Sequence, residues 1–310
     1  IIMMGWIGEM RGKRIFRFVK VICICAFVLN GSVVFAQKNN SKHDSKKARY
    51  SIHLPKGYTS SKTYPLVFNF HGMGSKAVKH EHYCKMDKVA DKEGFIVVYP
   101  QSTHFGWNAG LGFASYTNGP DDIGDLNKLL DTLESMYSID KKRVYATGVS
   151  LGGSLVYRIA CEMSDRIAAV ASVSGLMTDS TLVHCNAERH IPILHMHGTS
   201  DFIMSYDGKH QANGVEELLK IWTLKNQCVQ KPDTIQVPNR DKKDHSTVQL
   251  INYKDCAGKS EVWFYKIKNG GHAWPGGGNK FRIMGTKNDD FNGSQAVWDF
   301  FKKFTLDTGK

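Results

Sequence analysis

Short runs of apolar residues alternate along the chain with segments in which apolar residues recur every three or four positions. The runs are rich in β-branched and aromatic residues and are too short for helices, so they predict strands. Six of them are found, over residues 65–70, 95–99, 143–147, 168–173, 191–196 and 262–267. Four of the intervening or following segments have helical periodicity, over residues 123–137, 154–162, 215–222 and 296–304.

This alternation of strands and helices predicts an α/β fold, with a mostly parallel sheet and helices on both faces. Right-handed crossovers then bring the C-terminal ends of the parallel strands to one edge of the sheet, where ligands of such folds bind. Only residues 174–190 separate the fourth run from the fifth, which is too short for a cap domain. We therefore expect an open site that suits bulky or polymeric substrates.

Three glycine-containing segments follow predicted strands and carry a serine, an acid and a histidine in that order. They are Gly148-Val149-Ser150-Leu151-Gly152, His197-Gly198-Thr199-Ser200-Asp201 and Gly270-Gly271-His272-Ala273-Trp274-Pro275-Gly276. A serine hydroxyl becomes a strong nucleophile when an imidazole takes its proton and a carboxylate orients that imidazole. The Gly-x-Ser-x-Gly elbow with this order of residues is typical of α/β-hydrolases. The sequence thus predicts an ester hydrolase with Ser150, Asp201 and His272 as its catalytic triad.

Alternatives to these assignments exist within the sequence. Asp179 and Asp207 compete locally with Asp201. His195 and His197 alternate with apolar residues, which indicates packing or supporting roles. Residues His80, His82 and Cys84 have metal-ligand spacing but no fourth ligand nearby, so a solvated helix is expected there. We predict neither a metal site nor a cofactor.

An ester hydrolase also needs hydrogen-bond donors for the tetrahedral oxyanion. The backbone N–H of Leu151, at the start of the helix after Ser150, is one candidate. The second is the N–H of Met73 in His71-Gly72-Met73-Gly74, with that of Gly74 as the alternative. The long segment 101–120 contains Trp107, which we expect to line a groove for sugar or aryl groups together with Trp274.

The N-terminal region reads as a targeting segment. A basic stretch after Met10, the apolar run 21–29 and the sequence Val34-Phe35-Ala36 predict a secretory signal peptide over residues 1–36. Residues 1–9 precede Met10 and are a possible mis-assigned start. The apolar run is too short for a membrane span, so no stable membrane insertion is expected after cleavage. A basic leader over 37–49 and one catalytic domain over 50–310 complete the predicted organisation.

The net charge of the chain is +12, and removal of the five Lys/Arg and one Glu of residues 1–36 leaves +8. Aromatic and basic residues are not interleaved as in a nucleic-acid site, so no nucleic-acid partner is expected. Five cysteines remain in the exported chain, where disulfides are permitted. Their positions favour local pairings of Cys161 with Cys185 and of Cys228 with Cys256, which leaves Cys84 free; the sequence alone leaves the connectivity and the oligomeric state open.

Taken together, the three catalytic segments resemble the secreted polyhydroxybutyrate depolymerase-like esterases, which overlap with family 1 carbohydrate esterases such as feruloyl and acetylxylan esterases. The likeness runs from about Tyr50 to Phe304, and the His-Ala-Trp-Pro-Gly block is its most specific part. The resemblance implies the same triad and a Cys228–Cys256 bridge. Two departures are Leu151, where a polar residue is frequent, and Ser200, where alanine is common.

These observations lead to a hypothesis and its rivals. The hypothesis is a secreted or periplasmic serine esterase that releases hydroxycinnamate or acetate from plant cell-wall polysaccharide through an acyl-serine intermediate. A polyhydroxyalkanoate depolymerase would use the same mechanism on a polyester, and a serine peptidase would use it on peptides. A non-catalytic envelope or carbohydrate-binding protein that retains the fold is the alternative from another class.

Overall fold

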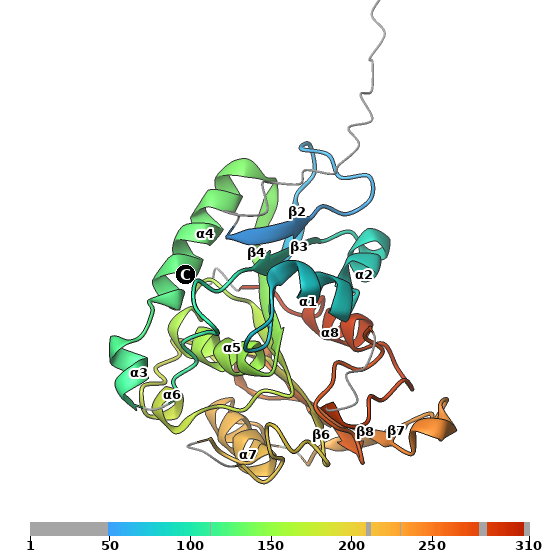
Figure 1. Ribbon diagram of the computed structural model, residues 1–310. Helices are drawn as coiled ribbons and strands as arrows, with labels where there is room; N and C mark the ends of the chain where they lie inside the picture. The colour runs from blue at the N-terminus through green and yellow to red at the C-terminus, as the bar shows by residue number, and fades with distance from the viewer. Residues whose placement is uncertain (1–48, 112, 209–211, 230, 279–283, 307–310) are drawn as a thin grey trace, which may run out of the picture. The chain divides into compact units, whose positions relative to one another are not determined.

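A computed structural model describes residues 49–111, 113–208, 212–229, 231–278 and 284–306. The predicted signal peptide and nearly all of the predicted basic leader lie outside these residues. The described residues form a nine-stranded sheet in the order β1-β3-β2-β4-β5-β6-β9-β8-β7 (Figure 1). Its strands are β1 (Tyr50–His53), β2 (Tyr64–Phe70), β3 (Ile96–Pro100), β4 (Ile139–Val149), β5 (Ala169–Val173), β6 (Ile193–Gly198), β7 (Asp233–Val237), β8 (Thr247–Tyr253) and β9 (Val262–Lys268).

The central six strands, from β3 to β9 in the sheet order, are parallel, which confirms the mostly parallel sheet. β1 pairs antiparallel with β3 at one edge, and β8 and β7 continue the sheet antiparallel beyond β9. β1, β7 and β8 were not predicted from the sequence. Their residues are mostly half-buried or exposed, so they lack the continuous apolar run that marks a strand covered on both faces.

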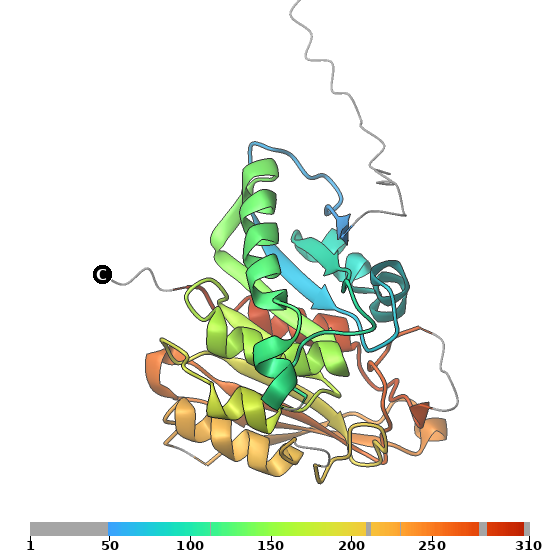
Figure 2. The same cartoon turned by 60° about the vertical axis from the view of Figure 1, so that its left-hand side comes forward.

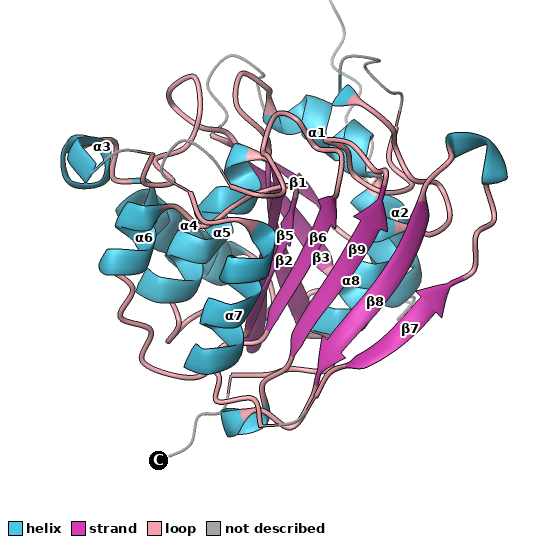
Figure 3. Cartoon of the chain, turned by 90° about the horizontal axis from the view of Figure 1, so that it is seen from below, coloured by secondary structure: helices cyan, strands magenta, loops and turns pink. Residues whose placement is uncertain are grey.

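Helices cover both faces of the sheet (Figures 2 and 3). On one face lie α3 (Phe113–Asn118), α4 (Asp122–Met136), α5 (Leu151–Glu162), α6 (Asp179–Val183) and α7 (Val215–Lys225). On the other lie α1 (Ala77–Cys84), α2 (Met86–Glu93) and α8 (Gly293–Phe301). The short 3₁₀ turns η1 (Lys242–Asp244) and η2 (Ala257–Lys259) flank β8 in the chain. The side chain of Asp121 caps α4 by accepting a hydrogen bond from the Gly124 N–H, as its position before the helix predicts.

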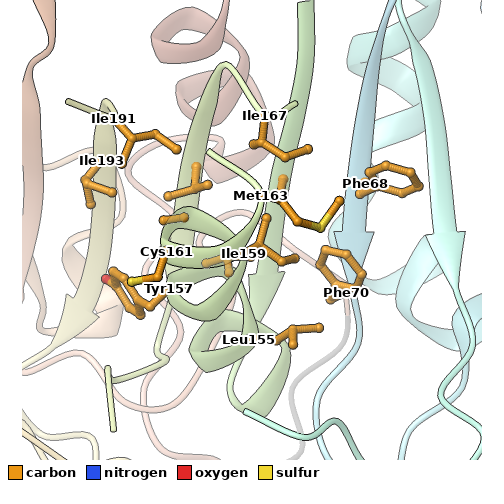
Figure 4. Packing of buried hydrophobic residues seen from close by; sticks show 14 of the residues in the cluster. Phe68, Phe70, Leu155, Tyr157, Ile159, Cys161, Met163, Ile167, Ile191 and Ile193 are labelled. Atoms are coloured by element: carbon orange, nitrogen blue, oxygen red, sulfur yellow. The ribbon is translucent and has the colours of Figure 1, made fainter. Parts of the chain in front are cut away.

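Each face of the sheet has its own apolar core. Successive residues of a strand point to opposite faces, so Val144 and Ala146 join the core under α4, α5 and α7 while Tyr145 joins the core under α1, α2 and α8. Figure 4 shows the first core, where α5 presents Leu155, Ile159 and other side chains between β2 and β6. Burial on both faces fixes the strand ends that carry the chemistry.

Two disulfides brace the sheet and its helices. Cys161 at the end of α5 is bonded to Cys185 before β6, and Cys228 after α7 is bonded to Cys256 before β9. Both pairings are those favoured from the sequence, and Cys84 is free and buried. Loops of 24 and 28 residues are closed in this way. In a chain-entropy account each such closure stabilises the fold by about 3–4 kcal/mol.

Candidate active site

Ser150 occupies a sharp turn between β4 and α5. Its backbone has φ 58° and ψ −126°, a conformation that residues with side chains rarely adopt. A side chain on Gly148 would come within 2.6 Å of the Gly152 carbonyl group, and one on Gly152 would overlap the carbonyl oxygen of Phe70. The two glycines therefore allow α5 to begin directly against the ends of β2 and β4, which is the packing expected of a nucleophile elbow.

Asp201 and His272 are joined by a hydrogen bond although they are 71 residues apart. Nδ1 of His272 lies 2.8 Å from Oδ2 of Asp201, and both side chains are buried. The other carboxylate oxygen of Asp201 accepts hydrogen bonds from the backbone N–H groups of Ile203 and Met204, at 3.0 and 2.9 Å. Because Nδ1 is engaged by the carboxylate, Nε2 of His272 is the nitrogen left to exchange a proton with another group.

The loops after β6 and β9 hold this pair together through their backbones. β6 and β9 are adjacent parallel strands, and the N–H of Ser200 donates to the carbonyl oxygen of Gly270 at 2.9 Å. The N–H of His272 donates to the carbonyl oxygen of Met284 at 2.7 Å. The acid and the histidine are thus fixed by main-chain contacts on both sides.

Ser150 follows β4, so it lies at the same C-terminal edge of the parallel strands as Asp201 and His272. In the described part of the chain, its Oγ has no hydrogen-bond partner, while its N–H donates to the carbonyl oxygen of Val173. The structure therefore links two of the three predicted catalytic residues by a hydrogen bond and places the third at the edge where both occur. Neither Asp179 nor Asp207 is bonded to His272.

The segment after β2 passes directly beside Ser150. A Cβ atom on Gly72 would lie 3.2 Å from Cβ and 3.7 Å from Oγ of Ser150. Within the described residues, the N–H groups of Met73 and Leu151 have no acceptor, whereas the N–H of Gly74 donates to the carbonyl oxygen of Phe105 at 2.7 Å. Gly74 is therefore engaged elsewhere, and Met73 and Leu151 remain the two candidate oxyanion donors.

His71 holds in place the oxyanion segment, residues 71–74, which carries the candidate donor Met73. Its Nδ1 lies 2.8 Å from the carbonyl oxygen of Gly72, which can only accept, so Nδ1 carries the hydrogen. Nε2 then accepts from the N–H of Ser102 at 3.2 Å. Burial lowers the pKa of His71, and the neutral ring is the form that these two contacts require. The indole N–H of Trp107 donates to the carbonyl oxygen of His71 at 2.8 Å and braces the same turn.

An apolar cavity of about 290 Å³ lies beside the candidate oxyanion donors. Its lining includes Met73, Phe105, Trp107, Leu111 and Leu151. Phe105 and Met73 are 76% and 60% exposed, so together they present apolar surface to solvent at the edge of this cavity. The cavity therefore offers an apolar compartment next to the residue that follows Ser150.

A family comparison identifies the chain. The sequence profile of the family described as esterase PHB depolymerase matches residues 48–203, which include Ser150 and Asp201. The chain belongs to this esterase family.

Curated relatives of this esterase-family chain carry esterase names. A bifunctional acetylxylan esterase/xylanase of Neocallimastix patriciarum is 27% identical over 87% of this chain, and feruloyl esterase B of Piromyces equi is 27% identical over 82%. The chain spans only 35% and 45% of the lengths of these two relatives. Feruloyl esterase D of Neurospora crassa is 26% identical over 89% of the chain and 87% of its own length.

Solved structures show the same fold. An acetyl xylan esterase from Aspergillus awamori superposes with a TM-score of 0.58 at 16% identity, and covers 82% of this chain and 93% of its own. A family 1 ferulic acid esterase from Anaeromyces mucronatus gives a TM-score of 0.51 at 17% identity, over 83% and 84% of the two chains. The chain therefore has the α/β-hydrolase fold, and residues 174–192, which contain only the short α6, leave no room for a cap domain between β5 and β6.

The two tryptophans predicted to bind substrate differ in their access to the apolar cavity of this esterase-family protein. Trp107 is largely buried but lines the apolar cavity. Trp274 is fully buried: its indole N–H donates to Oγ of Ser294, and its ring packs edge-on against His80. The prediction of substrate contact is wrong for Trp274, because its buried ring anchors the segment after His272 in the core instead of facing a groove.

The helix that carries His80, His82 and Cys84 was expected to be solvated, and two of these three residues are buried instead. His80 and Cys84 lie on the buried side of α1 and not in solvent. Nε2 of His80 lies 2.6 Å from Oδ1 of Asn69. Only His82 of the three is exposed. In the described residues, no group of three or more His, Cys, Asp or Glu side chains is arranged to hold a metal ion. Among the helices that the structure describes, none has the length and apolar character needed to cross a bilayer.

Sequence reasoning missed the individual roles of His71 and Phe105. The sequence places His71 in the motif that contains Met73, and its position directly after the apolar end of β2 indicates a buried ring. Phe105 belongs to the aromatic segment 101–120, but no periodic pattern distinguishes its exposed ring from packed ones. Only the folded loop shows that Phe105 reaches the cavity beside Leu151.

Proposed function

We propose that this protein is a serine carboxylic-ester hydrolase in which Ser150 is the nucleophile, His272 the general base and Asp201 the residue that orients His272. The single observation that carries the proposal is the Asp201–His272 hydrogen bond at the sheet edge where Ser150 stands in a strained elbow. A neutral imidazole with Nδ1–H bound to a carboxylate presents Nε2 as a base, which is the state that activates a serine.

The mechanism follows from these positions. Oγ of Ser150 attacks the ester carbonyl carbon while Nε2 of His272 takes the hydroxyl proton. The negative charge on the former carbonyl oxygen is met by the N–H groups of Leu151 and Met73. In a serine protease of different fold, removal of one such donor raises the barrier by about 2.7–4 kcal/mol. His272 then protonates the departing alcohol as the carbon–oxygen bond breaks, and an acyl-serine remains. Nε2 of His272 takes a proton from water, which attacks the acyl carbon. The bond to Oγ of Ser150 then breaks, the proton passes from His272 to Oγ, and the acid leaves.

The substrates are esters of plant cell-wall polysaccharide. The names of the fungal relatives include both feruloyl and acetylxylan esterases. The apolar cavity beside Leu151 suits an aromatic acyl group better than acetate, because a methyl group would leave Met73 and Phe105 without contact. The absence of a cap domain between β5 and β6 keeps the edge accessible to a polymer.

A polyhydroxyalkanoate is the second candidate substrate, and the description of the matching family favours it. The mechanism would be unchanged, with a hydroxyalkanoate as both the acyl group and the alcohol. We further propose that the protein acts outside the cytoplasm, in the periplasm or beyond the cell. Two disulfides support this placement, because oxidising compartments preserve such bonds.

A panel of esters tests the proposal. Methyl ferulate, acetylated xylan and hydroxybutyrate oligomers are incubated with the wild type, with Ser150→Ala and with Ser154→Ala. Ser154 is a matched control because it lies in the first turn of α5, four residues after Ser150, and its buried Oγ accepts a hydrogen bond from the Leu176 N–H. We expect hydrolysis of methyl ferulate by the wild type and by Ser154→Ala, and none by Ser150→Ala. Full activity of Ser150→Ala would refute the mechanism, and preferential cleavage of the hydroxybutyrate oligomers would select the polyester.

A further inference from the structure

A line of buried hydrogen-bonding side chains leads from α5 through β6 to Asp201. The hydroxyl oxygen of Tyr157 lies 2.7 Å from Nδ1 of His195, and Nε2 of His195 lies 3.1 Å from Nδ1 of His197. Nε2 of His197 lies 2.7 Å from the carbonyl oxygen of Met204 and 3.4 Å from Oδ2 of Asp201. The tyrosine, both histidines and the aspartate are buried, so solvent does not replace a missing partner.

These contacts determine which nitrogen of each histidine ring carries the hydrogen. A carbonyl oxygen only accepts, so Nε2 of His197 carries a hydrogen. Burial lowers the pKa of both His195 and His197, and each neutral ring has one donor and one acceptor. Nδ1 of His197 therefore accepts from Nε2–H of His195, and Nδ1 of His195 accepts from the Tyr157 hydroxyl. The hydrogen bonds run in one direction, from Tyr157 toward the acid.

The end of this line holds the turn that contains Asp201. Met204 is bound at two points: its N–H donates to Oδ1 of Asp201 and its carbonyl accepts from His197. The Ile203 N–H also donates to Oδ1, so Oδ2 is the oxygen left for His272. Loss of the His197 N–H would leave the Met204 carbonyl without this partner. The turn would then be held less firmly, and the Asp201 carboxylate could rotate away from His272.

We propose that His197 is a positioning residue for Asp201, and that Tyr157 and His195 set the tautomer in which His197 does so. The inference rests on the proposed function, because the orientation of Asp201 matters to turnover only if His272 acts as the base. His197 itself does not touch the reacting atoms. Its effect is to keep Oδ2 directed at Nδ1 of His272 while the imidazole gains and loses a proton at Nε2.

Two substitutions at His197 separate positioning from packing. His197→Leu removes the N–H, whereas His197→Gln retains an amide N–H that reaches the Met204 carbonyl. With a short soluble aryl ester, we expect His197→Leu to lower kcat by about 10–100-fold, as small misplacements of catalytic groups do, with KM unchanged. His197→Gln should recover most of kcat. Circular dichroism and the thermal midpoint establish that each variant is folded.

A matched tyrosine pair tests the remote end of the line and decides the question if His197→Leu does not fold. Tyr157→Phe removes the hydroxyl that donates to His195, and Tyr145→Phe removes an equally buried hydroxyl that donates to the Phe304 carbonyl outside the line. We expect a lower kcat at unchanged KM for Tyr157→Phe and wild-type kcat for Tyr145→Phe. Equal kcat values for the two variants would overturn the inference, because the line of hydrogen bonds from Tyr157 to His197 would then have no effect on turnover.

The outcomes also distinguish this inference from the proposed function. Wild-type kcat in folded His197→Leu, together with inactive Ser150→Ala, would refute positioning by His197 and leave the triad intact. Failure of His197→Gln to exceed folded His197→Leu would show that the ring packs rather than positions, and would likewise overturn the inference. Hydrolysis by Ser150→Ala would instead refute the proposed function itself.

Discussion

A methyl group on Gly198 would overlap the carbonyl group of Gly270, so the loops after β6 and β9 touch backbone to backbone. This close approach accompanies the hydrogen bond from the Ser200 N–H to the Gly270 carbonyl oxygen. It also brings two side chains from distant parts of the chain, Asp201 and His272, to 2.8 Å. The geometry of the acid–histidine pair thus depends on the absence of a side chain at position 198.

Gly198→Ala should separate this pair. The added methyl group forces the two loops apart, and overpacking of this kind costs about 1–3 kcal/mol of unfolding free energy. We expect kcat/KM for an aryl ester to fall by about 10²-fold, because the histidine loses its orientation. Gly278→Ala is the control, since its Cβ would meet neighbours only at 3.5 Å or beyond. Comparable activity of the two variants, measured with their thermal midpoints, would contradict the structural role of Gly198.

Asp201→Asn tests the assignment of the acid. An amide favours the wrong tautomer of His272, with the hydrogen on Nε2, and in serine proteases this change lowers kcat by about 10⁴-fold. We expect a loss of similar order in steady-state hydrolysis of methyl ferulate, with the protein still folded. Asp207→Asn, at an exposed competitor in the same loop region, should retain wild-type kcat. Loss of activity in Asp207→Asn with wild-type kcat in Asp201→Asn would show that Asp207 is the catalytic acid.

Much of this site was predictable because its chemistry lies at the ends of continuous apolar strands. The runs that became β2, β4, β6 and β9 are buried on both faces, so their pattern in sequence is strong and their parallel order places Ser150, Asp201 and His272 at one edge. The same logic failed for Trp274, since a pattern of residue types does not say whether a ring faces a groove or the core. It also failed for β7, whose residues are mostly exposed, and for β8, whose residues are mostly half-buried, because neither has a continuous apolar run.

The tautomers of the buried histidines were beyond sequence reasoning for a different reason. The positions of His195 and His197 indicated supporting roles, but their function depends on the Tyr157 hydroxyl and the Met204 carbonyl, which come from elsewhere in the chain. Contacts of this kind are set by tertiary packing. Periodicity predicts that such side chains are buried, and it does not predict their partners.

Phe105→Ala should change acyl specificity rather than chemistry. The Phe105 ring lines the apolar cavity beside Leu151, and loss of a large apolar contact is worth about 1.5–3 kcal/mol when the ring is covered by ligand. We expect kcat/KM for methyl ferulate to fall by about tenfold or more, and kcat/KM for p-nitrophenyl acetate to stay near the wild-type value. An equal loss for both esters would show that the ring supports the oxyanion segment instead of the acyl group.

Asp87 should make stability depend on pH. Burial raises the pKa of the Asp87 carboxyl to about 6 from an ordinary value of 3.8, although the Tyr99 hydroxyl donates to it at 2.6 Å and His53 lies 3.6 Å away. Between about pH 4 and pH 6 the folded protein therefore holds a proton that the unfolded chain has lost. The free energy of unfolding should fall as pH rises through this window and remain lower above it.

Asp87→Asn removes this titration and keeps an acceptor for Tyr99. Urea unfolding of the wild type and the variant at several pH values should give a difference in unfolding free energy that grows by up to about 3 kcal/mol in favour of the variant from pH 4 to pH 7. Parallel curves for the two proteins would contradict the raised pKa.

The most direct test of the whole account is the site of covalent labelling by a fluorophosphonate. An activated serine attacks the phosphorus and displaces fluoride, whereas an ordinary hydroxyl does not react at neutral pH. The purified protein is incubated with the reagent, its intact mass is measured, and the labelled peptide is mapped by mass spectrometry. The account predicts one adduct per chain, on Ser150, which is lost in His272→Ala. An unlabelled wild type, or an adduct on another residue, would contradict the assignment of Ser150, Asp201 and His272 as one catalytic unit.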